Sequence, residues 1–214
     1  MILATPVDTF EGLMAEIGPA LGERAWVTDV GSTKRGIHAA AERRLPRPGR
    51  FAGGHPMAGS EKGGAAEGRA DLLEGRPCIV TSTARTDPEV AAAAGRLWSS
   101  LGGRVVHLSP EAHDAAVAEI SHLPHAVASL VAALLAGRHP RLDLAAGGLR
   151  DTTRVAAGDP SLWVPILLEN ADQVGPLLGL LADDALALRA LLEKGDREGL
   201  RRHLEAAQRF RRSL

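Results

Sequence analysis

The first hundred residues alternate short apolar runs with amphipathic stretches. Most of the short runs are bounded by Gly, Pro or Asp, as expected of strands, and they lie at 2–4, 25–28, 50–52, 78–81 and 104–108. Between them, apolar residues recur at helical spacing over 10–21, 34–44 and 88–101. Asp87-Pro88 is a favourable helix start, because an acidic cap precedes a proline at the first helical position. This alternation predicts a largely parallel sheet with helices on its faces.

From residue 109 the pattern becomes helical throughout. A long helix is predicted from Ser109, with helically spaced residues Val117, Ile120, Pro124, Val127, Val131 and Leu134. Pro124 should kink it, because proline lacks an amide donor and clashes one turn back. Asp159-Pro160 starts another helix, 177–192 is leucine-rich, and 196–214 is basic and amphipathic. We therefore expect an α/β part over 1–109 followed by an all-α part over 110–214.

Composition excludes several classes of protein. The net charge of −1 argues against broad electrostatic binding of nucleic acid, and aromatic residues at 3% argue against base stacking. The single cysteine, Cys78, lies in an apolar run, which predicts a buried strand residue in a reducing cytoplasm. No signal peptide is evident, and no uninterrupted apolar run approaches the length of a membrane span.

Three clusters hold candidate chemistry. In the first, residues 53–62 read GGHPMAGSEK, so small residues surround His55 and allow close approach of backbone or ligand. An imidazole titrates near neutral pH and can take a proton from an alcohol. The simpler interpretation is a histidine in a surface loop that follows a strand ending near Ala52.

The second cluster, at 121–125, reads SHLPH. On a helix Ser121 and His125 share a face one turn apart, whereas His122 points about 100° away from Ser121 and is the poorer candidate. A core imidazole bonded to a carbonyl is the alternative for either histidine. The third cluster, RDTTR at 150–154, sets Arg150 and Arg154 one turn apart. Arginine forks bind carboxylates through two parallel hydrogen bonds, and a surface salt bridge is the alternative.

In their order along the chain, these clusters resemble the prephenate/arogenate dehydrogenase family of tyrosine biosynthesis. Further segments similar to the family's landmarks are LATPV at 3–7, TDVGSTK at 28–34, DPSLW at 159–163 and EN at 169–170. The resemblance covers nearly the whole chain. It implies a partial Rossmann-like domain followed by a helical domain that binds substrate and forms a homodimer.

The resemblance also implies a reaction and its residues. A hydride passes from the carbon bearing the hydroxyl of prephenate or arogenate to NAD or NADP, and carbon dioxide leaves the same ring. His55 resembles the catalytic histidine, and Ser32, at the end of a strand, resembles the serine that orients it. A helix cap is the alternative for Ser32. Ser121 and His125 would bond substrate oxygens, and Arg154 a substrate carboxylate.

Other positions carry weaker implications from the same resemblance. Arg150 stands where family members often have a basic residue, and Glu61 would lie at the pocket mouth, although most loop glutamates are simply solvated. Trp163 resembles an aromatic residue that reaches the active site across the subunit interface, with a core anchor as the alternative. The remaining implied residues, on the nicotinamide side of the cofactor, are Thr5, Pro6 and Ser32.

One family landmark is missing. Members begin with a strand, a Gly-x-Gly-x-x-Gly turn and a helix, and no Gly-x-Gly occurs among the 24 glycines here. We therefore expect a dehydrogenase that lacks its phosphate-binding front part, or else a non-catalytic remnant that dimerises and binds prephenate or tyrosine. Metal hydrolysis through His55, His122 and His125 is disfavoured, since the spacing differs from that of His-Glu-x-x-His, and we expect no metal.

Overall fold

The computed structural model describes residues 1–59, 68–138 and 141–214. Its contacts divide the chain into two compact units, Met1–Gln173 and Val174–Leu214. The domain boundary proposed near residue 109 falls inside the first unit, between the last strand and the first helix of the all-α part. It remains a proposal.

Five short strands, most of them separated by helices, lie among the described residues in the first part of this unit. They are β1 (Ile2–Leu3), β2 (Thr28–Asp29), β3 (Gly53–Pro56), β4 (Pro77–Thr81) and β5 (Arg104–Leu108). β1 and β2 pair in parallel, as do β4 and β5, whereas β3 and β4 are antiparallel. A parallel bridge between Val27 and Phe51 connects the two groups of strands. The predicted Rossmann-like sheet is therefore present, with one antiparallel pair that the sequence pattern did not indicate.

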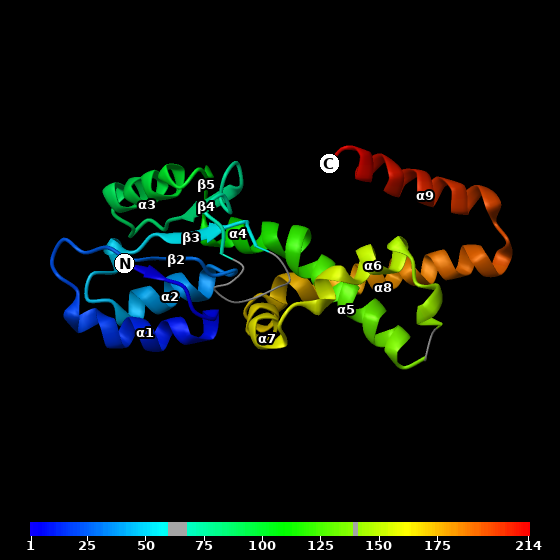
Figure 1. The fold of residues 1–214 in the computed structure, drawn as a ribbon, viewed down its shortest axis with the longest axis horizontal. Helices are drawn as coiled ribbons and strands as arrows, with labels where there is room; N and C mark the ends of the chain where they lie inside the picture. The colour runs from blue at the N-terminus through cyan, green and yellow to red at the C-terminus, as the bar shows by residue number, and fades with distance from the viewer. Residues whose placement is uncertain (60–67, 139–140) are drawn as a thin grey trace. The chain divides into compact units, whose positions relative to one another are not determined.

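Helices lie on both sides of these strands. α3 (Pro88–Ser100) covers one side, and α1 (Phe10–Ile17) and α2 (Arg35–Arg44) lie on the other (Figure 1). α3 starts where expected, because the Asp87 side chain accepts a hydrogen bond of 2.9 Å from the amide of Glu89. Short 3₁₀ segments occupy Val7–Thr9, Gly18–Ala20, Pro48–Arg50, Leu142–Leu144 and Arg154–Ala157.

The predicted long helix is interrupted by a different kind of turn. α4 (Pro110–Val117) continues through a π-helical segment, Ala118–His122, into α5 (Leu123–Ala136). The irregular turn ends just before Pro124, which has no amide to give to a regular α-helical ladder. π-helical turns are rare, occur mostly as single turns inside α-helices, and are frequent at functional sites.

This continuous helix is apolar on average, although charged residues and histidines interrupt it. Among the described residues, Pro110–Ala136 is the one helix whose length and mean hydropathy of 1.4 would allow it to cross a bilayer. One such helix is weak evidence for a membrane span. Its most apolar part is 28% buried, and its buried face carries His113 and Asp114, which bond residues of β3 and α2. Leu130 and Leu134 remain more than half exposed.

Two further helices complete the first unit. α6 (Gly147–Thr153) precedes α7 (Pro160–Glu169), whose predicted cap is confirmed by a 2.8 Å bond from the Ser161 amide to Asp159. α7 places Ile166 in the core beside Trp163, and this cluster also contains Leu3, Val7, Phe10, Met14, Val27, Ile37, Leu45 and Phe51. The helical part therefore shares a hydrophobic core with the strands and with α1 and α2.

The second unit consists of two helices. α8 (Ala171–Lys194) begins in the first unit and continues into the second, and α9 (Arg197–Arg212) follows. Gly195 adopts a left-handed conformation with φ of 65°, and the Asp196 side chain accepts a 2.9 Å bond from the Gly199 amide. These residues end one helix and cap the next. Both were predicted, as the leucine-rich and the basic amphipathic segments.

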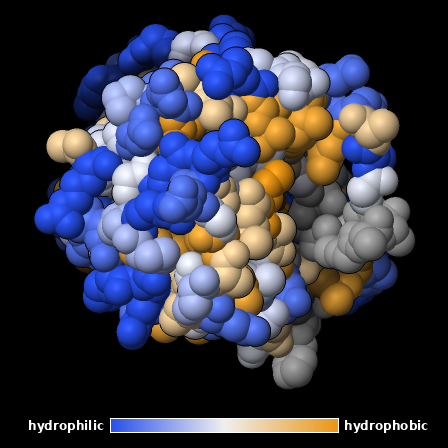
Figure 2. All heavy atoms as spheres, turned by 90° about the vertical axis from the view of Figure 1, so that its left-hand side faces the viewer, coloured by the Kyte–Doolittle hydropathy of each residue, from blue (hydrophilic) through white to orange (hydrophobic). Residues whose placement is uncertain are grey.

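The surface is not uniformly polar. Figure 2 shows apolar side chains gathered in a band between hydrophilic regions on one face of the molecule. At the start of the chain Met1 and Ile2 are about half exposed. A band of this kind is typical of a surface that is covered in an assembly or by another segment.

Candidate active site

His55 lies inside β3 and not in a loop after it. The strand pairs His55 with Ile79 of β4, and the imidazole is about nine-tenths buried. The two glycines before it allow the strand to run close to its neighbours. A Cβ atom on Gly54 would lie 2.5 Å from the Asp29 carbonyl oxygen, and one on Gly53 would collide with Thr81. The glycine-rich sequence thus serves the packing of β3 first.

A buried ion pair lies beside this strand. Asp29, at the end of β2, accepts hydrogen bonds from the amides of Gly31 at 2.8 Å and Gly54 at 3.0 Å. The Lys34 ammonium lies 2.6 Å from the same carboxylate and also donates to the carbonyls of Gly31 and Thr33. Burial lowers the pKa of Lys34, and the Asp29 carboxylate acts in the opposite direction. The pair fixes the loop after β2 against β3.

His55 is bonded to a second histidine from the helical part. Its Nδ1 atom lies 2.8 Å from Nε2 of His113 in α4, and the other ring nitrogen of His113 lies 2.8 Å from Oδ1 of Asp114. Asp114 also accepts hydrogen bonds from the backbone amides of Lys34 and Arg35 and from the Arg35 guanidinium. Sequence reasoning missed His113 and Asp114. The available signal was a histidine and an aspartate on the apolar side of the predicted helix.

The electrostatic setting of His55 opposes a positive charge. Burial is the main cause that moves the pKa of His55 well below its usual value, and Lys34, His113 and His122 act in the same direction. Burial also lowers the pKa of His113. For Asp114, burial acts to raise the pKa, but the hydrogen bonds from His113 and from the backbone outweigh it and the pKa is lowered. Neutral imidazoles therefore face an ionised carboxylate.

His122 is more central than its spacing suggested. It is buried, its Nδ1 atom lies 3.1 Å from the Asn170 amide nitrogen, and Asn170 also donates to the Asp114 carbonyl. Burial lowers the pKa of His122 to about 4. On a regular α-helix His122 would point about 100° away from Ser121, whereas both residues lie in the π-turn, where each residue rotates the chain by less. Ser121 itself is half-buried.

His125 and Trp163 form a stacked pair within the same chain. Their rings are 3.5 Å apart and inclined by only 7°. Burial lowers the pKa of His125, while a hydrogen bond with the backbone of Val155 acts in the opposite direction. Because Arg154 precedes Val155, this bond brings the 3₁₀ segment of Arg154 next to His125. The second and third clusters are therefore neighbours in space.

The other candidates occupy varied positions. Arg150 in α6 and Arg154 are both exposed, and Glu61 lies outside the described residues. Thr5 is exposed and its hydroxyl lies 2.6 Å from that of Thr9. Ser32 is half-buried in a bend after β2, which ends at Asp29, so it does not belong to a strand as expected. Within the described residues, the hydrogen-bond partner found for His55 is His113 and not Ser32.

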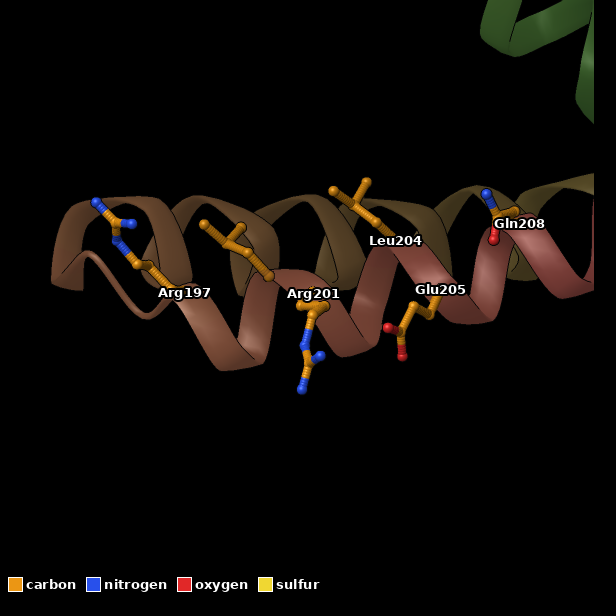
Figure 3. Close-up of a pocket in the computed structure, with 6 residues that line it drawn as sticks. Arg197, Arg201, Leu204, Glu205 and Gln208 are labelled. Carbon is orange, nitrogen blue, oxygen red and sulfur yellow. The ribbon is translucent and has the colours of Figure 1, made fainter.

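At least two hollows in the described surface lie outside this cluster. One, of about 750 Å³, lies beside Pro56 and is lined by Val30, Leu73 and Trp98 among others. A second, of about 480 Å³, runs along α9, and Figure 3 shows its side chains, with Leu204 pointing away from Arg201 and Glu205. The α9 groove contains none of the candidate site residues.

Comparison with known families places the chain among nucleotide-binding dehydrogenases. Residues 1–107 match the family model of the prephenate dehydrogenase nucleotide-binding domain, and residues 109–206 match that of the prephenate dehydrogenase dimerization domain. The chain belongs to the prephenate dehydrogenase family. This membership confirms the resemblance stated from the sequence, the fold class and the assignment to NAD(P)-dependent oxidoreductases.

Individual relatives agree with this assignment. The chain is 34% identical to the cyclohexadienyl dehydrogenase of Zymomonas mobilis over 100% of its own length and 74% of that protein. It is 35% identical to the prephenate dehydrogenase of Bacillus subtilis, again over its whole length but only 59% of that protein. The structure of prephenate dehydrogenase from A. aeolicus in complex with hydroxyphenyl propionate and NAD+ matches with a TM-score of 0.91 and 34% identity. That match covers 99% of this chain and 75% of the other.

Proposed function

We propose that the protein converts prephenate to 4-hydroxyphenylpyruvate and carbon dioxide, with a hydride passing to NAD+ or NADP+. The observation that supports this most is the buried His55, which has Nδ1 bonded to His113 and lies at the carboxyl end of β3. β1 runs parallel to β2, and the segment at Phe51, which leads into β3, runs parallel to the segment at Val27. The carboxyl ends of β1 and β2 therefore lie at the same edge of the sheet. Ligands of open α/β sheets bind at this edge.

His55 would act on the substrate hydroxyl through Nε2. As the hydride leaves the hydroxyl-bearing carbon, the oxygen gains carbonyl character and its proton becomes more acidic. A neutral imidazole accepts that hydrogen bond and takes up the proton as the charge develops. Loss of carbon dioxide then gives the aromatic ring, and the proton returns to the phenol oxygen, so the net reaction consumes no base. The low pKa of His55 keeps the imidazole neutral before the reaction.

Substrate recognition would use the helical residues. Arg154 is proposed to bind a substrate carboxylate, with Arg150 as a second cation. Ser121 and His125 would bond other substrate oxygens, with Glu61 near the pocket mouth. Trp163 supports the ring of His125 by stacking. Its proposed role across a subunit interface rests on the family resemblance.

The cofactor proposal concerns the nicotinamide end alone. Thr5 and Pro6 follow β1, and Ser32 follows β2, so all three lie beyond the carboxyl ends of two parallel strands. The hydroxyls of Thr5 and Ser32 would bond the nicotinamide carboxamide or ribose, with Pro6 beside them. When bound, NAD+ or NADP+ supplies the hydride-accepting ring.

Arogenate remains a second candidate substrate, since it differs from prephenate by an amino group in place of the side-chain keto oxygen. The comparisons favour an enzyme and give no support to the non-catalytic remnant. We further propose a cytoplasmic homodimer, joined by the part that matches the dimerization domain.

The test is an assay of nicotinamide reduction by the full-length protein. Prephenate and arogenate are each supplied with NAD+ and with NADP+, and product is identified by mass. We expect reduction that depends on prephenate and yields 4-hydroxyphenylpyruvate. Turnover of arogenate alone would reassign the substrate, and no turnover with either compound would refute the proposal.

A further inference from the structure

A series of hydrogen bonds leads from His55 to a buried carboxylate. Three groups are in series: Nδ1 of His55, the two ring nitrogens of His113, and Oδ1 of Asp114, with both links 2.8 Å long. His113 and Asp114 are essentially fully buried. These hydrogen bonds join β3 to α4, two segments that are far apart in the sequence.

Asp114 determines which atom is the donor in each of these hydrogen bonds. Its Oδ1 atom accepts from the Lys34 amide at 2.7 Å, and its Oδ2 atom accepts from the Arg35 amide at 3.0 Å and Nε at 3.1 Å. Both oxygens thus face donors that cannot act as acceptors. These two amides and the Arg35 guanidinium stabilise the anion, and the pKa of Asp114 is lowered, so the group is an ionised carboxylate that can only accept.

The protons on both histidines follow from this carboxylate. His113 must carry its proton on Nδ1 in order to donate to Asp114. A neutral imidazole then has an unprotonated Nε2, which can only accept, so His55 must donate from Nδ1. The lone pair of His55 is left on Nε2, the nitrogen that is free of His113. This is the nitrogen a general base would use.

We propose that His113 and Asp114 are positioning residues that hold His55 in the Nδ1–H tautomer and stabilise its protonated form. The proposal rests on the proposed function for its catalytic consequence, but the tautomer itself does not depend on it. When Nε2 accepts a proton, the new charge lies one hydrogen bond from a neutral ring and two from a carboxylate. As in a catalytic triad, a buried carboxylate sets the tautomer of the base and stabilises its protonated form, but here a second imidazole lies between the base and the carboxylate.

The surrounding charges explain why such stabilisation is needed. Lys34 is a buried cation near His55. A positive charge on His113 or His122 would also disfavour a charged His55 ring, so His113 can stabilise that ring only while it is itself neutral. Asp29 is committed to Lys34 and to two backbone amides. Asp114 is therefore the carboxylate to which His55 is connected by hydrogen bonds.

The experiment combines tautomer-sensitive ¹⁵N NMR of histidine-labelled protein with kinetics. The His55 signals are assigned by their loss in His55→Asn. In the parent we expect a protonated Nδ1 and an unprotonated Nε2. His113→Phe removes the acceptor, so the proton should move towards Nε2 and kcat should fall by about 10²-fold while KM for prephenate stays within about threefold.

A conservative variant separates positioning from packing. In His113→Gln the amide oxygen can occupy the place of Nε2 and accept from His55, so the Nδ1–H tautomer and most of kcat should be retained. Circular dichroism confirms that each variant is folded. A parent in which His55 carries its proton on Nε2, or equal losses of kcat in the Gln and Phe variants, would overturn the proposal. If the tautomer is as expected but no substrate turns over, the positioning stands and the proposed function fails.

Discussion

The ammonium of Lys34 lies 2.6 Å from the carboxylate of Asp29, and neither side chain has any exposure to solvent. The pair connects the end of β2 to the residue that precedes α2, and Asp29 also holds the Gly54 amide next to His55. A buried pair gives little net stability in itself, because both charges lose their hydration, but breaking it leaves one charge without compensation.

Lys34→Met should therefore destabilise the protein severely. Removal of one partner of a buried pair costs about 3–5 kcal/mol of unfolding free energy. Urea unfolding followed by circular dichroism measures the loss. Arg85→Met is the matched control, because Arg85 pairs with Glu42 on the surface at 3.5 Å and should make little difference. Similar losses in both variants would contradict the role given to burial.

Stability should fall in acid because of His38. Its ring bonds the Thr81 hydroxyl at 2.9 Å, and burial, with Lys34 as a second cause, lowers its pKa from 6.5 to about 4. The unfolded state therefore binds more protons than the folded state between pH 6.5 and pH 4, and stability is lost as the pH falls through this window. At pH 5, protonation of His38 in the unfolded state lowers the free energy of unfolding by about 2 kcal/mol relative to its value at neutral pH.

The variant His38→Gln tests this contribution. We expect its unfolding free energy to change less between pH 7.5 and pH 5 than that of the parent, even if the variant is less stable at both values. His203→Gln on the exposed surface of α9 serves as the control. If the unfolding free energy of His38→Gln changes between pH 7.5 and pH 5 by as much as that of the parent, another group is responsible.

His55→Asn should lower kcat far more than it weakens substrate binding. The basicity of the imidazole matters chiefly while the hydroxyl loses its proton, which is an interaction of the transition state. A general base contributes roughly 10²–10⁴-fold. Steady-state kinetics with prephenate measure the effect, and a variant within a few-fold of the parent would remove His55 from the mechanism.

Arg154→Ala should instead raise KM for prephenate. Loss of a charge-assisted hydrogen bond to a carboxylate weakens binding by about 10- to 100-fold. Arg150→Ala, one turn earlier and equally exposed, provides the comparison and should have the smaller effect. If KM changes only in the Arg150 variant, the two arginines exchange roles.

The helical part should form a homodimer. Leu130 and Leu134 on α5 are exposed at 57% and 60%, which is unfavourable for two leucines on one helix face unless another surface covers them. Light scattering should report a dimer at micromolar concentration, and the double variant Leu130→Glu, Leu134→Glu should be monomeric. Leu101→Glu, at an exposed leucine beyond α3, should remain dimeric.

A monomeric parent would contradict this prediction. It would also remove the support for placing Trp163 at or near an interface, which remains an expectation from the family resemblance. Trp163 would then act within one chain alone, by stacking on His125 and by packing against the core beside Ile166.

Much of the fold was determined by the sequence alone. The strands at 77–81 and 104–108 and the helices that begin at Pro88 and Pro160 follow from local pattern and from caps whose chemistry is complete within a few residues. The clusters around His55, His125 and Arg154 were likewise visible, because their residue types and order resemble a family in which they act together.

Only the tertiary structure decided how these pieces meet. The antiparallel pairing of β3 with β4 depends on contacts between distant segments, and the π-turn that brings in His122 departs from the regular spacing assumed from sequence. His113 and Asp114 look like ordinary helix residues until packing brings α4 against β3 and the start of α2. Burial and hydrogen-bond partners set the protonation of these groups, and both arise between segments that local sequence does not connect.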